Sequence, residues 1–75
     1  MTTRITSTTL ATGETTTITS RLSPAQVRSD LLDDWEDMGR PYYTRRDGGV
    51  LTCERFDHGF AQAPVLRVTI REVAK

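Results

Sequence analysis

The segment that most constrains the fold is 23–39, SPAQVRSDLLDDWEDMG, because it carries both a start signal and a stop signal for a helix. Ser23 can cap the N-terminus, Pro24 suits the first helical position, and Gln26 completes a capping box with Ser23. Gly39 stands where a left-handed residue usually follows a helix, and the proline two residues later prevents continuation. The segment therefore predicts one helix with defined ends.

This helix has an apolar side and an acidic side. Spacings of four, four and three residues place its apolar residues on one stripe: Val27, Leu31, Trp35 and Met38. We expect the stripe to cover a sheet with Trp35 in the core, the alternative being a partly exposed Trp35 at a protein interface. The opposite side carries four carboxylates: Asp30, Asp33, Glu36 and Asp37.

Residues 3–22 predict a β-hairpin before the helix. Two runs rich in Thr, Ile and Leu flank Gly13, which can supply the positive φ of a turn, and β-branched residues favour strands. A low-complexity threonine tract open to phosphorylation is the competing interpretation. Alternation places Ile18 and Leu22 on one face of the second strand, and Ile5 on one face of the first, so the inner face of the hairpin is poor in core residues.

Residues 41–56 predict a second hairpin with its turn at Asp47-Gly48-Gly49, where either Asp47-Gly48 or Gly48-Gly49 can form the loop. A two-residue loop places one set of side chains on a common face: Tyr42, Thr44, Leu51 and Cys53. It places a second set on the other face: Tyr43, Arg45, Thr52 and Glu54. A three-residue loop shifts this register, and the sequence leaves that alternative open.

The segment 65–73 alternates most clearly, with apolar residues facing in and the intervening arginines and threonine facing out: Arg67, Thr69 and Arg71. The element order is therefore β-β-α-β-β-β. We expect an α+β fold, with one helix on one face of a mostly antiparallel sheet of four or five strands, as a single domain over 1–75.

Bulk composition narrows the classes of function. The formal net charge is zero, which removes the bulk electrostatic argument for binding nucleic acid or a membrane, and favours self-association, so a homodimer is a hypothesis to test. A single cysteine permits no internal disulfide and suits a reducing compartment. No apolar run reaches the length of a membrane span. We therefore expect a cytoplasmic protein that does not bind membranes.

Sequence motifs for chemistry are weak. A zinc site needs about four well-placed ligands, whereas this chain has one cysteine and one histidine. A Cys53/His58 nucleophile and base is the least favoured alternative, because alternation turns Cys53 inward. Carboxylates on a solvated helix face are not expected to bind a metal or to have perturbed pKa values. We predict no catalytic residues, no metal and no cofactor.

Charge is distributed unevenly along the chain. Residues 24–38 hold five acids and one arginine, a net charge of −4, whereas the other residues hold nine bases and five acids, a net charge of +4. Two explanations stay open: Arg40, Arg45 and Arg46 fold back over the helix, or the acidic face docks onto a basic partner. The sheet face away from the helix is a second candidate surface, for nucleic acid or another anion: Tyr43, Arg45, Arg67 and Arg71.

The leading functional hypothesis is a small non-enzymatic interaction protein that binds another macromolecule through the acidic helix face, the sheet face, or both. A protein partner is expected, and the role would be that of a regulator or inhibitor, including one encoded by a phage or mobile element. The alternative is a sheet protein that binds nucleic acid.

Overall fold

The structure, a computed structural model, describes residues 2–73, so Met1 and residues 74–75 of the predicted domain lie outside the described part. The described residues form one helix and five strands in the predicted order β-β-α-β-β-β: β1 Thr2–Thr9, β2 Glu14–Ser20, α1 Pro24–Asp37, β3 Tyr42–Asp47, β4 Val50–Arg55 and β5 Leu66–Val73. The predicted α+β class is confirmed.

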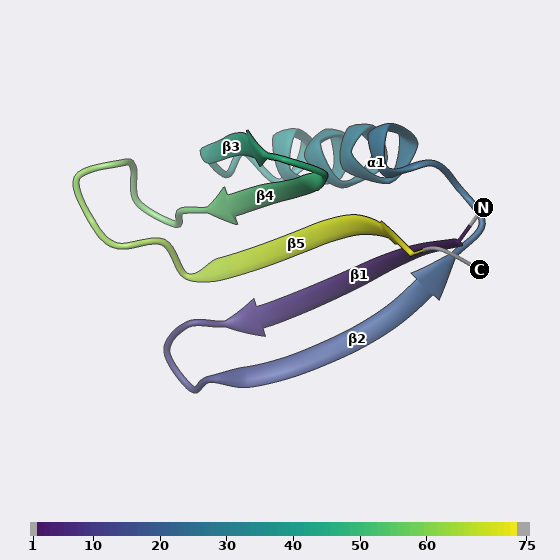
Figure 1. Ribbon diagram of the computed structural model, residues 1–75. Helices are drawn as coiled ribbons and strands as arrows, with labels where there is room; N and C mark the ends of the chain where they lie inside the picture. Colours follow the sequence, from purple (N-terminus) through teal and green to yellow (C-terminus); the bar gives the residue numbers. More distant parts are fainter. Residues whose placement is uncertain (1, 74–75) are drawn as a thin grey trace.

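The five strands form one sheet in the order β2-β1-β5-β4-β3, and each neighbouring pair is antiparallel. The last strand of the chain therefore lies at the centre, between the first strand and the second hairpin. The helix α1 packs against β4 and β5 on one face of the sheet. Figure 1 shows α1 above the β3–β4–β5 side, while β1 and β2 extend away from it.

The ends of α1 form as the sequence predicts, with one exception. The Ser23 hydroxyl accepts a hydrogen bond from the Gln26 backbone N–H at 3.2 Å, and Gly39 has a φ of 70° after the C-cap residue. A capping box also requires the Gln26 side chain to accept a hydrogen bond from the Ser23 backbone N–H, and this part of the prediction is wrong. The Gln26 amide Nε2 instead donates to Asp30 at 2.9 Å, one turn further along the helix.

The predicted apolar stripe is correct for three of its residues and wrong for the fourth. Val27 and Trp35 are buried, with Trp35 only 3% exposed, and Leu31 is half-buried. Met38 is 51% exposed, because α1 has ended by that residue and its side chain no longer lies over the sheet. Leu32, which the four-residue spacing does not select, packs against the core instead.

The second hairpin has the two-residue loop Gly48-Gly49, and Gly48 takes the positive φ of 62° that the turn requires. Asp47 pairs with Val50, and Thr44 pairs with Cys53. Both predicted faces of this hairpin are confirmed, because that register follows from the two-residue loop.

The core lies between α1 and the strands β4 and β5. Its buried residues come from α1, β4 and β5: Val27, Trp35, Leu51, Cys53, Val68 and Ile70. Cys53 is fully buried, as alternation predicts, and Val68 and Ile70 of β5 are buried too, whereas the third inward residue of β5, Leu66, is half-buried. Trp35 is thus a core residue, and its ring lies 6.1 Å from the ring of Tyr42.

The first hairpin forms at the predicted place, with Gly13 at a φ of 78° in its turn. Its second strand does not enter the core, because α1 packs on β4 and β5 and does not cover it. Ile18 is 56% exposed, because it lies on the helix side of the sheet where no helix covers β2. The predicted place of Leu22 on this strand is wrong, because β2 ends at Ser20 and Leu22 lies exposed in the segment that leads into α1.

Candidate functional site

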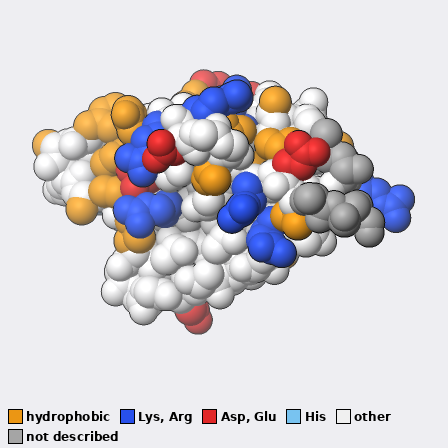
Figure 2. Space-filling view, viewed as in Figure 1, with side chains coloured by type: hydrophobic (Ala, Val, Ile, Leu, Met, Phe, Trp, Pro, Cys, Tyr) orange, Lys and Arg blue, Asp and Glu red, His pale blue; other side chains and the backbone are white. Residues whose placement is uncertain are grey.

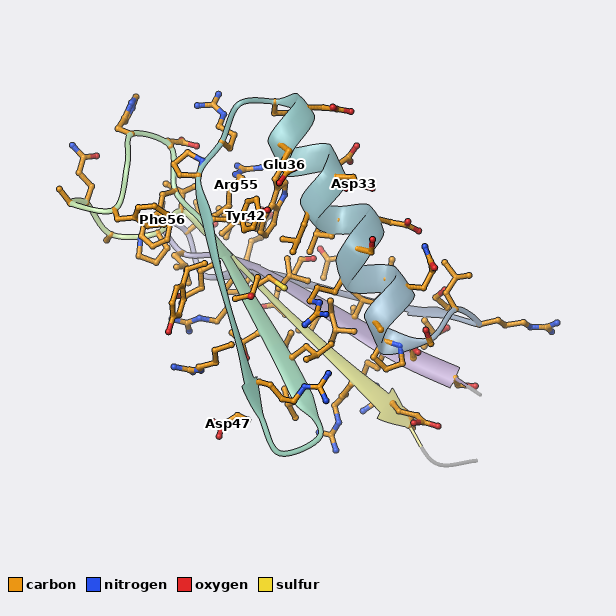
Figure 3. The ribbon with its side chains drawn as sticks, turned by 90° about the horizontal axis from the view of Figure 1, so that it is seen from above. Asp33, Glu36, Tyr42, Asp47, Arg55 and Phe56 are labelled. Atoms are coloured by element: carbon orange, nitrogen blue, oxygen red, sulfur yellow. The ribbon has the colours of Figure 1, made fainter. Side chains whose placement is uncertain are left out.

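The acidic helix face consists of Asp30, Asp33, Glu36 and Asp37. All four are exposed, and so is the neighbouring Asp34. They occupy the side of α1 away from the core residues Val27 and Trp35. Figure 3 shows Asp33 on this outer side, and Glu36 turned toward Tyr42 of β3. The helix thus separates an apolar contact with the sheet from a row of carboxylates in solvent.

Two of these carboxylates have neutral hydrogen-bond partners. The Tyr42 hydroxyl donates to Glu36 at 2.7 Å, and the Gln26 amide donates to Asp30 at 2.9 Å. The hydrogen bond to Glu36 raises the pKa of Tyr42, with smaller contributions from desolvation and from the charges of Glu36 and Asp33. These contacts fix side-chain positions, but they leave the negative charge of the helix unchanged.

The arginines near the helix end do not neutralise it. Arg40 was one of three residues expected to fold back over α1, but its guanidinium lies 3.7 Å from the Asp57 carboxylate and so holds the loop after β4. Arg55 lies 3.9 Å from the same carboxylate. Among residues 2–73, no ion pair joins a carboxylate of α1 to an arginine. Within these residues the folding-back explanation is therefore wrong.

The open sheet face is the surface turned away from α1. Register and alternation bring all of the predicted sheet-face residues onto it, namely Tyr43, Arg45, Arg67 and Arg71, and they add Arg4. Within the described strands its acids are Asp47 and Glu54, so this part of the face carries four arginines against two carboxylates. Figure 2 shows basic side chains next to a broad uncharged area. The molecule therefore has an acidic side and a basic side opposite it.

Two arginines lie directly opposite each other on this face. Arg4 of β1 pairs across the strands with Arg71 of β5, and among residues 2–73 neither has an ion-pair partner. Like charges in this position destabilise a sheet. Arg67 differs, because its Nε donates to Glu54 at 2.9 Å and so its charge is already matched. The Arg4–Arg71 pair therefore places two positive charges side by side on the face, without a matched carboxylate among residues 2–73.

A row of threonines lies next to the arginine pair on the open sheet face. One row of neighbouring residues crosses four strands: Thr17, Thr6, Thr69 and Thr52, with Arg45 next on β3. Hydroxyl oxygens meet across β1 and β2 at 3.5 Å between Thr6 and Thr17, and at 3.3 Å between Thr8 and Thr15. Hydroxyls can donate to phosphate or carboxylate oxygens, so this row would support the arginines in holding an anion. The aromatic group is Tyr43, which is 54% exposed.

Residues predicted to carry no chemistry lie apart from these two surfaces. Burial raises the pKa of the Cys53 thiol, and a reactive thiol needs the opposite environment. His58 is exposed in the loop after β4. Within residues 2–73, no group of three His, Cys, Asp or Glu side chains is placed to hold a metal ion.

A hollow of about 280 Å³ lies between the start of α1 and the β3–β4 turn. Arg46 and Glu72 both line it, so their charges oppose each other there.

The feature that sequence reasoning missed is Arg4. Alternation with Ile5 could have placed Arg4 on the outward side of its strand, but its pairing with Arg71 depends on β1 lying next to β5, which no local pattern reveals.

Comparisons with protein-family models, with curated proteins and with solved structures found no match to this chain. The helix that the structure describes is too short and too polar to cross a membrane.

Proposed function

We propose that this protein is a non-enzymatic binding protein whose acidic helix face docks onto a basic surface of a protein partner. The observation that carries the proposal is the set of exposed carboxylates on α1, none of which forms an ion pair with an arginine of residues 2–73. The same residues include arginines that could have supplied such pairs. A regulator or inhibitor, of the kind that phages and mobile elements encode, would act by covering the partner's surface.

The clustered carboxylates of α1 lower the stability of the free protein. Asp30 with Asp34, and Asp33 with Asp37, are like-charge pairs one turn apart, each destabilising a helix by about 0.2–0.5 kcal/mol. The carboxylates in the last turn of α1 also lie at the end where the helix dipole disfavours anions, and that turn contains no basic residue to offset them. Lysine or arginine side chains of a partner would relieve both effects, and they would also accelerate association.

Affinity capture from the native host, followed by variants, tests this proposal. Asp33→Asn combined with Asp37→Asn should weaken capture of the partner while keeping or raising the melting temperature. Asp47→Asn is the matched control, because Asp47 is an exposed carboxylate on the open sheet face. Capture should also weaken as salt concentration rises. Unchanged capture by the double variant would show that the carboxylates serve solvation alone.

Binding of nucleic acid to the open sheet face is the second candidate, and the observation that favours it is the Arg4–Arg71 pair without an acidic partner in residues 2–73. Retention on a single-stranded oligonucleotide should rise as salt concentration falls, because phosphate contacts release counterions. Arg4→Ala with Arg71→Ala should abolish it, whereas Arg46→Ala, on the other face, should not. Absence of retention at low salt would remove this candidate.

A further inference from the structure

Among residues 2–73, no strand pairs with the outer edge of β2. β1 is its neighbour on one side, and β2 ends the sheet on the other. Every residue from Glu14 to Thr19 is exposed. Backbone N–H and C=O groups along the outer side of such a strand are free to pair with another chain. This edge is independent of the acidic helix face.

The edge lacks the devices that usually prevent pairing. Proteins protect edge strands with charged side chains, proline, bulges or a covering element. After Glu14, β2 reads TTTITS, with neither a charge nor a proline, and its pairing with β1 is regular over the whole strand. α1 packs on β5 and β4, which are two and three strands away from β2 in the sheet. The strand is also seven residues long, enough for a continuous ladder.

The other edge strand of the sheet, β3, has features that protect it from pairing. β3 carries Arg45, Arg46 and Asp47 in succession, and Pro41 precedes it. Its first residue is tied to α1 by the hydrogen bond from Tyr42 to Glu36. Figure 1 shows α1 alongside β3, whereas β2 lies at the far side of the sheet. The contrast marks β2 as the edge that accepts a partner strand.

We propose that two copies of this chain pair through their β2 edges, antiparallel about a two-fold axis, so that their sheets become one continuous sheet. Such an interface is self-complementary, since the same strand serves both copies. Because the net charge is zero, no overall charge repulsion keeps two copies apart. Antiparallel pairing also places the two Glu14 side chains at opposite ends of the interface, so they do not face each other.

The side chains of β2 suit this partner. Ile18 is 56% exposed on the helix side of the sheet, next to the half-buried Ile5 with which it pairs. Pairing centred on Ile18 brings it directly opposite the partner subunit's Ile18, and pairing centred on Thr17 brings the two into diagonal contact. In both registers the interface removes exposed apolar surface, and β-branched threonines form the remaining cross-strand pairs. Both open sheet faces then lie on the same side of the dimer.

Sedimentation equilibrium of the full chain over a wide concentration range tests the pairing. The wild-type chain should form a dimer. Ile18→Lys and Ile18→Glu should each weaken dimerisation about tenfold, because like charges then meet across the two-fold axis. Mixing the two variants should restore a dimer, since each lysine then faces a glutamate. Both substitutions are at an exposed position, so circular dichroism should show an unchanged fold.

Phe60→Lys is the matched control, because Phe60 is a similarly exposed apolar residue, at 63%, in a loop away from β2. It should leave the dimer unchanged. A wild-type chain that stays monomeric at the highest concentration would overturn the proposal. A dimer that survives in both charged variants would overturn it as well, because the contact would then lie elsewhere on the molecule.

Discussion

Strands β4 and β5 lie under α1 and supply Leu51, Cys53, Val68 and Ile70 to the core, whereas β2 is exposed from Glu14 to Thr19. The two halves belong to one antiparallel sheet with continuous pairing. They differ in what lies above them, since α1 covers one half and not the other. Backbone pairing is thus shared by both halves, and apolar burial is confined to one.

This difference indicates how the uncovered hairpin is held. β1 pairs with β5 along its whole length, so the hairpin is attached to the covered half through backbone hydrogen bonds. The fully buried Thr3 adds a side-chain hydrogen bond from its hydroxyl to the Leu22 carbonyl, which ties β1 to the segment leading into α1. Strands held in this way contribute less to global stability than strands with packed side chains.

Replacing one apolar residue in each half gives the largest expected contrast. Trp35→Ala should lower the free energy of unfolding by about 3–5 kcal/mol, because a large buried side chain leaves a cavity. Ile18→Ala should change it by less than about 0.5 kcal/mol, as for an exposed site. Urea denaturation at low protein concentration, where the chain is monomeric, measures both. Similar losses in the two variants would contradict the confinement of the core to the covered half.

Alanine at the two turn glycines sharpens the comparison. Gly48 and Gly13 both have positive φ with open space around the position of a Cβ, so alanine adds backbone strain of about 1–2 kcal/mol without a clash. Gly48→Ala should show this loss in urea denaturation. Gly13→Ala should show a smaller one, because local opening of the uncovered hairpin relieves the strain, with faster amide exchange in β2. Gly49→Ala, at a residue without positive φ, is the control and should be nearly neutral.

A smaller effect on the free energy of unfolding is expected from the carboxylates on the outer side of α1. Asp33→Asn with Asp37→Asn should raise the free energy of unfolding by about 0.5 kcal/mol, because a like-charge pair near the helix C-terminus is removed. Glu14→Gln in the uncovered hairpin should have no such effect. The gain should shrink as salt concentration rises. A loss of stability in the double variant would mean that these carboxylates have a favourable contact within the fold.

The smallest effect concerns the link between α1 and β3. The hydrogen bond to Glu36 raises the pKa of Tyr42, so the stabilisation it brings is complete below the ordinary tyrosine pKa and is lost as pH rises through the raised value. Ultraviolet titration of a Tyr43→Phe variant would follow Tyr42 alone. Adding Glu36→Gln should bring the pKa of Tyr42 back toward its ordinary value. An unchanged titration would show that Glu36 is not its partner.

Local patterns in the sequence determined much of the fold. The caps at Ser23 and Gly39, a turn at Asp47-Gly48-Gly49 and the alternation in 65–73 act between residues close in the chain, so each could be read without knowing the fold. The element order followed from them. The faces of the second hairpin followed only for a two-residue loop, and it is the pairing of Asp47 with Val50 in the structure that excludes the three-residue alternative. The acidic side of the helix was also evident, because helical spacing alone sorts its carboxylates from its apolar residues.

Only the tertiary structure decided how the segments are combined. β5 lies between β1 and β4, and that order creates the Arg4–Arg71 pair and leaves β2 at an unprotected edge. It also decided that Ile18 and Met38 are exposed and that Arg40 contacts Asp57. These contacts join residues far apart in the chain, and their geometry depends on where one short helix lies on a wider sheet. Local propensity sets the elements, whereas the area that α1 can cover sets which of their faces are buried.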